Sequence, residues 1–436
     1  MAKHGNKSES QEMWFGKKYF EKVKSYPKDR VEKTLFQQNQ SKAKDQLLTE
    51  RTQNQIKQLE KNHLGFFKDP FDFEIYIPTN HLTTEALISD SNYPITVTIS
   101  STGIHTQIKA ELKKQGVVIG DVSQIREKKP DIISRFKKSG HPVRNSAISS
   151  LIHAATDNAL FVYIPKEMAI EGTILIKLDC EVENAVIPLH LVTKIEQSAT
   201  ANISLQIISN DKSAGKKVIV LQTDFLVGED SQLSIFRHQT ADDKTLVFVD
   251  DEISQARSSR VEYFNFDEGA KGLSSKIALL LNGEGTHASI TGIYRPRQES
   301  RYFYDTEQIH SASYSESDLL YDGVIGEEAY ASWQGNIIVE SGTKGANGYQ
   351  ANNNMIIHSS GKVESVPGLE IITDDVKCSH GVTIGNIDKN HMFYLQSRGI
   401  NKDEAEKLII NGFLESSLIR IKSKEIKKQI SAIFDI

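Results

Sequence analysis

A long series of short β-forming runs constrains this fold more than any other feature of the sequence. From about residue 166, and for about two hundred residues, runs of mostly four to eight β-forming residues alternate with polar turns. The runs are Thr173–Ile176, Ala185–His190, Ala201–Ile207, Gln232–Phe236, Thr245–Val249, Lys276–Leu281, Ala288–Tyr294, Asn336–Val339 and Asn354–Ile357. No long helical pattern separates them, so the sequence does not fit a doubly wound α/β sheet.

Two all-β architectures remain, a sandwich or barrel and a β-solenoid. The turns repeat Gly or Asn beside small polar residues, as in Gly228–Ser231, Gly283–Thr286, Gly326–Ala329 and Gly345–Gly348. These loosely similar units recur at spacings near the ~20 residues of one solenoid coil. The turns therefore favour a parallel β-helix.

The residue pattern divides the chain into four regions. They are an N-terminal helical arm (1–70), a mixed α/β region (71–165), the β-helix core (166–386) and a C-terminal helical subdomain (387–436). In the arm, one helical face carries the aromatic residues Trp14, Phe15, Tyr19 and Phe20. A solvated arm that packs loosely on the body is the favoured interpretation, and a partner-binding arm is the alternative.

The C-terminal region carries helix signals. Asp388 can cap a helix that runs through Gln396, and Gly399 suits the position just after its end. Residues 401–404 read Asn-Lys-Asp-Glu, which has the form of a capping box. An apolar stripe follows, made of Leu414, Leu418, Ile421, Ile426, Ile430 and Phe434. We therefore expect capped helices with one apolar face.

Charge and composition exclude several classes of partner and cofactor. The net charge is −5 and the pI is near 6.3, which argues against nucleic acid or an anionic membrane as the main partner. No apolar run approaches the ~20 residues that span a bilayer, and the polar start does not resemble a signal peptide. No phosphate-binding loop is present, so we expect no nucleotide bound by this chain itself. These features predict a soluble, cytoplasmic protein.

The stretch from Ile371 to Gly381 is the first place to look for chemistry. It holds Cys378, one of only two cysteines, and His380. Two cysteines are too few for a disulfide framework or for a closed zinc site made of thiols. If the stretch is one strand, alternation places Asp374, Val376, Cys378 and His380 on the same face.

A thiol and an imidazole on one strand face permit two interpretations. Cys and His bind iron or zinc well, and a neighbouring imidazolium lowers the pKa of a thiol. One Cys and one His make at most half of a metal site. From spacing alone, a buried cysteine beside a hydrogen-bonded histidine is therefore favoured. Asp305, Glu307 and His310 resemble an acid/base cluster, but carboxylates of this kind usually face water.

A longer motif around this stretch resembles a known family. It comprises Pro367–Gly381, Thr383, Gly385, Asp388, Phe393–Leu395 and Ser397–Ile400. It resembles the C-terminal signature of the SufB/SufD family of iron–sulfur cluster assembly proteins, and it is nearer to SufD than to SufB. Weaker similarity at Tyr321–Val324 and Phe161–Lys166 extends the resemblance over roughly residues 115–436.

The resemblance implies a fold, two partners and a site. The implied fold is a right-handed parallel β-helix with helical ends, paired through the β-helix with a SufB-like subunit. A SufC-like ATPase would dock on the C-terminal helices. Cys378 and His380 would lie at the subunit interface, where they are the expected ligands of transient iron or an iron–sulfur cluster. The residues expected at the partner interface are Phe393, Tyr394, Arg398 and Gly399.

Three positions depart from patterns of the family. Gly381 stands where SufB-like proteins have Glu, and Asn352 stands near the position of their sulfur-accepting cysteine. Gln396 replaces the arginine that is common in Tyr-Leu-Arg-Ser-Arg-Gly. The first two departures favour a SufD-like subunit over a SufB-like scaffold.

The sequence therefore predicts a non-catalytic, SufD-like subunit of a cytoplasmic iron–sulfur cluster assembly complex. The alternative from a different class is a β-helix polysaccharide lyase or hydrolase, which would use carboxylates on an exposed strand face. A β-helix that pairs with a second copy of itself, without a SufB-like partner, is a further alternative.

Overall fold

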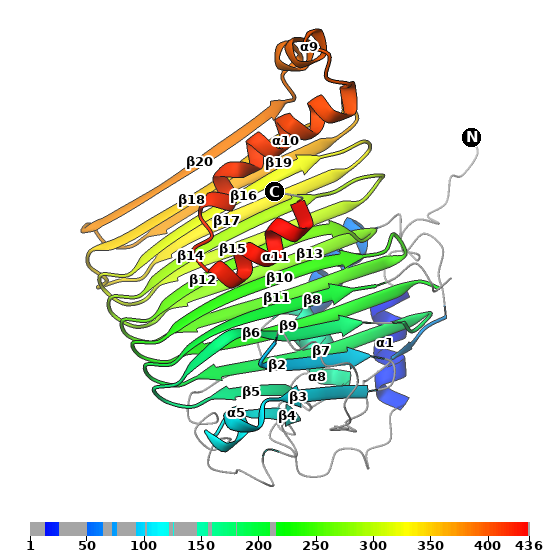
Figure 1. Cartoon of the computed structure of the whole chain (residues 1–436). Coiled ribbons are helices and arrows are strands. Elements are labelled where there is room, and N and C mark those ends of the chain that lie inside the picture. Colours follow the sequence, from blue (N-terminus) through cyan, green and yellow to red (C-terminus); the bar gives the residue numbers. More distant parts are fainter. Residues whose placement is uncertain are drawn as a thin grey trace.

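The computed structural model of this chain is a parallel β-helix with helices packed on its two outer faces (Figure 1). It describes residues 14–25, 50–63, 72–75, 93–100, 103–121, 125, 146–155, 159–179, 181–209 and 215–434. Two ten-stranded sheets form the walls of the β-helix. From β5 to β20 the chain alternates between them, with odd-numbered strands in sheet A and even-numbered strands in sheet B. The predicted parallel β-helix is confirmed.

The strands of the β-helix are long and regular. Those of sheet A are β5 (Leu160–Ile164), β7 (Ala185–Ile195), β9 (Lys217–Val227), β11 (Thr245–Gln255), β13 (Gly272–Leu281), β15 (Arg301–His310), β17 (Tyr330–Val339) and β19 (Lys362–Ile371). Those of sheet B are β6 (Ala169–Asp179), β8 (Thr200–Ile208), β10 (Gln232–Ala241), β12 (Arg260–Gly269), β14 (His287–Arg295), β16 (Glu316–Ile325), β18 (Ala346–Ile356) and β20 (Val376–Asn386).

Shorter elements close one end and cover the faces. The short strands are β1 (Glu74–Ile75), β2 (Ile95–Ser100), β3 (Gly103–Ile108) and β4 (Val118–Asp121). The helices are α1 (Trp14–Ser25), α3 (Glu50–Asn62), α5 (Ala110–Lys114), α8 (Ala147–Ala155), α9 (Lys389–Ser397), α10 (Lys402–Ile419) and α11 (Lys424–Phe434). None of the described helices is long and apolar enough to cross a membrane.

Each coil is longer than the turn pattern predicted. Paired positions in neighbouring coils, such as Gln232 and Arg260, lie 28 residues apart, whereas the sequence suggested about 20. The spacing varies, because Thr200 pairs with Gln232 and Arg260 pairs with His287. The reason is strand length: most β-helix strands have nine to eleven residues, and the short apolar runs mark only parts of them.

One corner of the β-helix is a column of residues in the left-handed backbone region. Asp230, Ser258 and Tyr314 have φ values of 53°, 56° and 55°, and Gly285 and Gly345 continue the column at 68° and 62°. The N–H of each of the five donates to a carbonyl oxygen in the next coil. These hydrogen bonds stack the turns, so the register of one coil is passed to the next as far as β20.

The interior of the β-helix contains charge as well as apolar side chains. Arg237 is buried, and its guanidinium lies 3.3 Å from carboxylate oxygens of both Asp251 and Asp267. The Arg237 Nε also donates to the Tyr263 hydroxyl at 2.9 Å. A buried guanidinium requires such directional partners, so this network specifies how the middle coils stack.

The described part of the N-terminal arm packs closely on the body, so the prediction of a loosely packed arm is wrong there. Phe15 and Tyr19 are buried, and the Tyr19 hydroxyl donates to the Leu151 carbonyl at 2.7 Å. The physical reason is that outward side chains of sheet A, such as Val218, are apolar and need a cover. The side chains of Trp14 and Phe20 lie outside the described residues.

The C-terminal helices follow the predicted caps and stripe. The Asp388 carboxylate accepts from the Asn390 N–H at 2.7 Å, and the Asn401 side chain accepts from the Glu404 N–H at 2.9 Å. Leu414 and the other buried members of the stripe, Ile421, Ile426 and Ile430, pack on outward phenylalanines of sheet B. Helices α10 and α11 therefore cover one face of sheet B, while α9 lies beyond β20 (Figure 1).

Candidate functional site

Cys378 and His380 lie on the last strand of the β-helix. In the register between β18 and β20, Cys378 is opposite Gly348 and His380 is opposite Gln350. Gly348 and Gln350 point into the β-helix, so Cys378 and His380 occupy the inward positions of the last coil. Among the described strands, β20 pairs with β18 alone, and its other edge is open. The structure therefore brings the predicted thiol and imidazole to the open end of the β-helix.

Asp374 does not belong to this row, because the condition that Ile371 to Gly381 form one strand is not met. Strand β19 ends at Ile371, and β20 begins at Val376. The residues between them form the last corner, where the Asp375 carbonyl accepts from the Gly345 N–H at 2.7 Å. The stacking of turns, which the local alternation does not reveal, interrupts the strand.

The thiol of Cys378 is half-buried beside apolar side chains. Cys378 packs against a small cluster that contains Ile337 and Val339. Burial raises the pKa of the Cys378 thiol, and a hydrogen bond from the Gly348 backbone acts in the opposite direction. Cys378 is therefore a protonated thiol near neutral pH in the free chain. Cys180 lies outside the described residues.

A buried histidine lies on the inner side of Cys378. His310 Nδ1 is 2.7 Å from the Ser315 hydroxyl, and Nε2 is 2.8 Å from the Ser317 hydroxyl. Because Ser315 donates to the Ala312 carbonyl, it accepts from Nδ1–H, and Nε2 carries the lone pair. Burial lowers the pKa of His310 to about 4, so the imidazole is neutral.

Gly348 keeps the space between the histidine and the cysteine open. A Cβ on Gly348 would lie 3.3 Å from both Cys378 Sγ and His310 Nε2. His310 does not form a cluster with Asp305 and Glu307, because strand alternation turns His310 inward and the two carboxylates outward, which agrees with the interpretation favoured from the sequence. There, Lys276 Nζ lies 3.8 Å from Asp305 and 3.0 Å from Glu307.

His380 is exposed, and the residue beneath it is a buried glutamine. No described residue forms a hydrogen bond with the His380 side chain. The Gln350 amide nitrogen donates to the carbonyl oxygens of Gly335 at 3.4 Å and Gly368 at 2.9 Å, which fixes the orientation of the amide. Gln350 Oε1 is buried and has no partner among the described residues. A buried acceptor of this kind can hold the N–H of an imidazole that turns inward.

The open end offers only part of a metal site. In the described part of the chain, no group of three or more His, Cys, Asp or Glu side chains is placed to hold a metal ion. Cys378 and His380 alone are two donors, and iron or zinc usually takes four. Asn352, which stands near the SufB cysteine position, is buried and donates to the Tyr294 hydroxyl at 3.0 Å.

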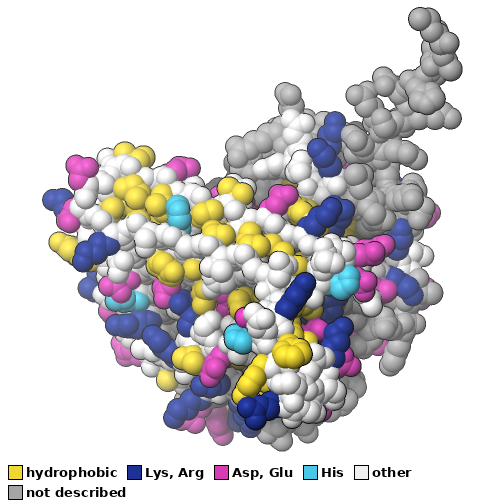
Figure 2. Space-filling model, turned by 90° about the horizontal axis from the view of Figure 1, so that it is seen from above, with side chains coloured by type: hydrophobic (Ala, Val, Ile, Leu, Met, Phe, Trp, Pro, Cys, Tyr) yellow, Lys and Arg dark blue, Asp and Glu magenta, His cyan; other side chains and the backbone are white. Residues whose placement is uncertain are grey.

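Apolar side chains surround these two donors at the open end. Leu369, Ile371, Ile372, Val382 and Ile384 are between 38% and 68% exposed, and all lie on β19, on β20 or in the turn between them. Figure 2 views the molecule from this end and shows hydrophobic side chains gathered across the upper part of the visible face. We call these five residues the apolar rim. An exposed apolar patch beside open sheet edges is typical of a protein interface.

A second exposed surface lies on α9. Phe393 is 73% exposed and Tyr394 is 56% exposed, and the Arg398 guanidinium lies 5.3 Å from the centre of the Tyr394 ring. Gly399 has φ +91°, a conformation that favours glycine, and it ends the helix. The four predicted interface residues therefore lie together at one end of the molecule.

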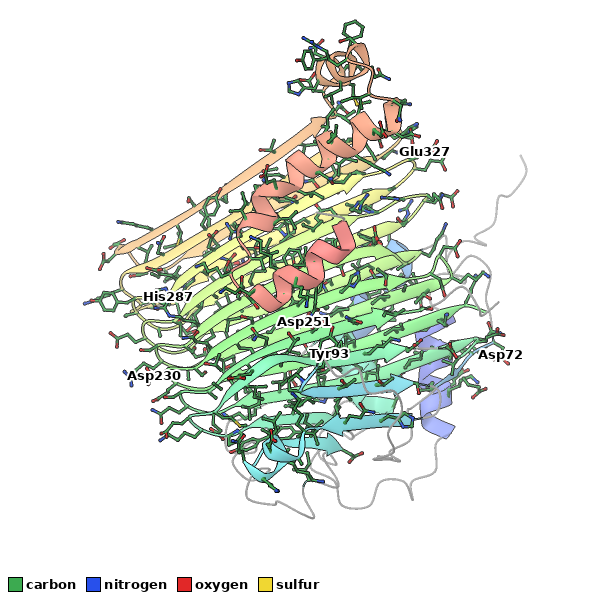
Figure 3. All side chains as sticks on the ribbon, viewed as in Figure 1. Asp72, Tyr93, Asp230, Asp251, His287 and Glu327 are labelled. Atoms are coloured by element: carbon green, nitrogen blue, oxygen red, sulfur yellow. The ribbon has the colours of Figure 1, made fainter. Side chains whose placement is uncertain are left out.

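A cleft of about 510 Å³ lies between α9, α10 and the end of the β-helix. Its lining includes Glu327, His358, Met392, Phe393, Gln396 and Glu406. Glu327 lies beside the start of α10 (Figure 3). An aromatic side chain beside a mixed polar and apolar cleft suits recognition of another protein.

The sequence did not indicate that Gly348 and Gln350 lie at the site, or that the His310 side chain points into the β-helix beside it. All three are neighbours of the site only through the pairing between coils. The offset between coils varies, so local spacing gives no signal for them. A correct alignment of the coils would have identified Gly348 and Gln350.

Two family models match the chain. The SUF system FeS cluster assembly SufBD core domain matches residues 180–413, and the SufBD protein N-terminal region matches residues 92–176. A Bacillus subtilis iron–sulfur cluster assembly protein SufD is 25% identical over 382 residues, which cover 86% of this chain and 87% of that protein. The Escherichia coli SufD is 30% identical over 185 residues, 42% of this chain and 44% of that protein. A Synechocystis SufBD family protein is 28% identical over 203 residues, 46% of this chain and 44% of that protein.

Proposed function

Since this chain belongs to the SufBD family of iron–sulfur cluster assembly proteins, we propose that it is the SufD-like subunit of a cytoplasmic assembly complex. In this proposal the chain is not itself an enzyme. It supplies one half of a cluster-building site and a docking surface for an ATPase. The observation that carries the proposal is a thiol and an imidazole on an open strand edge, surrounded by exposed apolar side chains.

The apolar rim supports a SufB-like partner at the open end. In the part of the chain that the structure describes, β19 and β20 each leave one sheet edge unpaired, and natural proteins seldom leave such edges exposed beside apolar side chains. A second β-helix that covered this end would bury the rim residues Leu369, Val382 and Ile384. A second copy of this chain is the alternative occupant, and the mass of the purified complex separates the two.

The donor set supports a shared site for the cluster, which is the cargo of the complex. Cys378 and His380 are suitable ligands for iron, but two donors need further ligands from another chain. Metal binding requires the Cys378 thiol to lose its proton. Gln350 Oε1 would accept the N–H of His380 and so fix which ring nitrogen faces the metal.

The surface of α9 supports docking of a SufC-like ATPase. Phe393 and Tyr394 are large, exposed and aromatic, which is typical of residues that carry binding energy. The chain lacks a phosphate-binding loop of its own, so nucleotide hydrolysis would belong to the docked partner. Movement of the ATPase subunits would then pull on the C-terminal helices.

A polysaccharide lyase or hydrolase has no support from these observations. The relatives named above are iron–sulfur cluster assembly proteins. The outward carboxylates of Asp305 and Glu307 both form ion pairs with Lys276 on sheet A, which is a structural role.

Replacement of His380 tests the proposal. The complex is purified from cells that express the wild-type chain or His380→Ala, and bound iron and acid-labile sulfide are measured. The variant is expected to assemble with its partners at normal yield while cluster content falls more than about tenfold. His287→Ala is the control, because His287 is a half-buried histidine on β14 that pairs with Glu316 and lies on a strand without the candidate donors. Normal cluster content in His380→Ala would remove His380 from the site.

A further inference from the structure

The buried carboxylate of Asp322 connects the C-terminal helices to the strands beneath the candidate site. Asp322 lies on the outer face of β16 and is fully buried under α10. One oxygen, Oδ2, accepts from the hydroxyls of Ser417 at 2.6 Å and Ser416 at 3.2 Å, both on α10. The other oxygen, Oδ1, accepts from the Asn353 amide on β18 at 3.1 Å. One carboxylate therefore binds the helix and the neighbouring strand at the same time.

The strand side of this connection leads directly to the last coil. Asn353 is paired with Thr383 on β20, the strand that carries Cys378 and His380. Among the described strands, β18 is the only one that pairs with β20 in a sheet. A shift of β18 is therefore passed to β20 through their ladder of backbone hydrogen bonds.

The remaining contacts of α10 are apolar packing and the polar contacts of Arg420, which also donates to the Thr291 hydroxyl at 3.2 Å and to the Asp318 carbonyl at 3.1 Å. Leu414 and Ile410 pack on outward apolar side chains of sheet B, and apolar contacts permit sliding. Arg420, just after α10, pairs with Asp318 at 3.0 Å, but this carboxylate is half-exposed. Burial raises the pKa of Asp322, and hydrogen bonds from Ser417 and Asn353 act against that rise. If α10 moved, Asp322 would lose its strongest donors, so the docked position of the helix is well defined.

We propose that Asp322 couples the position of α10 to the position of β18 and β20, so that movement of the C-terminal helices changes access to Cys378. The proposal rests on the proposed function only for the source of the movement, a partner that pulls on these helices. Asp322 is a positioning residue in this scheme, because it does not touch the thiol or the imidazole.

Coupling of this kind is reciprocal, which provides the test. The isolated full chain is studied by hydrogen exchange with Ser417→Ala, which breaks the helix side, and with Asn353→Ala, which breaks the strand side. Ser417→Ala is expected to speed amide exchange in β20, and Asn353→Ala is expected to speed exchange in α10. The amide exchange rate is expected to rise roughly three- to tenfold in each case. The double variant is expected to exchange little faster than either single variant.

Asp318→Asn is the matched control, because it removes a different carboxylate contact at the end of α10 and leaves Asp322 intact. A second readout is alkylation of Cys378 in a Cys180→Ser background, where Ser417→Ala is expected to raise the rate and Asp318→Asn is not. If Ser417→Ala speeds exchange in α10 but leaves β20 and Cys378 unchanged, Asp322 is only an anchor and the proposal fails. These measurements need neither partner nor cluster, so failure of the proposed function would leave them unaffected.

Discussion

Gly348→Ala places a single methyl group between Cys378 and His310, and its effect can be worked out from the structure. The new Cβ would lie 3.0 Å from Ile337 Cγ2 and 3.3 Å from both Cys378 Sγ and His310 Nε2. These contacts are too short, so at least one neighbour must move by a few tenths of an ångström. His310 is held by two serine hydroxyls, whereas Cys378 has an open side. The thiol is therefore the group that moves, and it moves towards solvent.

The expected stability change is small because two effects oppose each other. Overpacking a core site costs about 1–3 kcal/mol, and replacing Gly by Ala in a compatible backbone returns about 0.4–1 kcal/mol through the unfolded state. The free energy of unfolding is therefore expected to fall by about 0–2.5 kcal/mol, since Cys378 can yield but the closest neighbour, Ile337, is buried.

The thiol itself should report the displacement. Burial holds the pKa of Cys378 high, so a thiol pushed outward is expected to have a lower pKa. A larger thiolate fraction at neutral pH is therefore expected, and alkylation is expected to be faster. The assay is the rate of alkylation by iodoacetamide as a function of pH, in a Cys180→Ser background.

Gly385→Ala is the control for this prediction. Gly385 lies on the same strand as Cys378, and a Cβ there would meet nothing within 4 Å. Its alkylation profile is expected to match that of the parent protein. An unchanged thiol pKa in Gly348→Ala would refute the reasoning that places Cys378 against His310.

Three further predictions test other parts of the molecule. Phe393→Ala is expected to abolish binding of the ATPase partner without changing the melting temperature, because the ring is 73% exposed; pull-down and thermal unfolding measure the two outcomes. The double variant Leu369→Lys with Val382→Lys is expected to leave the isolated chain folded but to prevent pairing with the SufB-like subunit, and a heterodimer that still forms at normal yield in size-exclusion chromatography would contradict it. Burial, aided by Arg301, lowers the pKa of His63 from the ordinary 6.5 to about 3. The unfolded chain therefore binds the proton first, so the free energy of unfolding should fall as the pH drops from about 6.5 towards 3, by up to about 1.4 kcal/mol per pH unit. Denaturant midpoints of wild type and His63→Asn, measured between pH 4 and 7, should converge as the pH falls.

Much of the C-terminal half could be predicted from local signals. The caps at Asp388 and Asn401 are local hydrogen bonds, so the residue types at those positions were sufficient to predict them. The same holds for the apolar stripe, because helical periodicity places Leu414 and Ile426 on one face. The β-helix itself was predicted because many β-forming runs without long helices between them leave few architectures.

The sequence by itself determined the fold class and the family, and it pointed to the two candidate donors at positions 378 and 380. It did so because strand alternation, helix caps and a long motif are all short-range patterns along the chain. Only the tertiary structure decided which side chains surround those donors. His310, Gly348 and Gln350 reach the site through stacking of successive coils, and the coil offset varies with the length of each turn. Asp374 left the predicted row for the same reason, because the stacked corner, and not local alternation, sets where β20 begins.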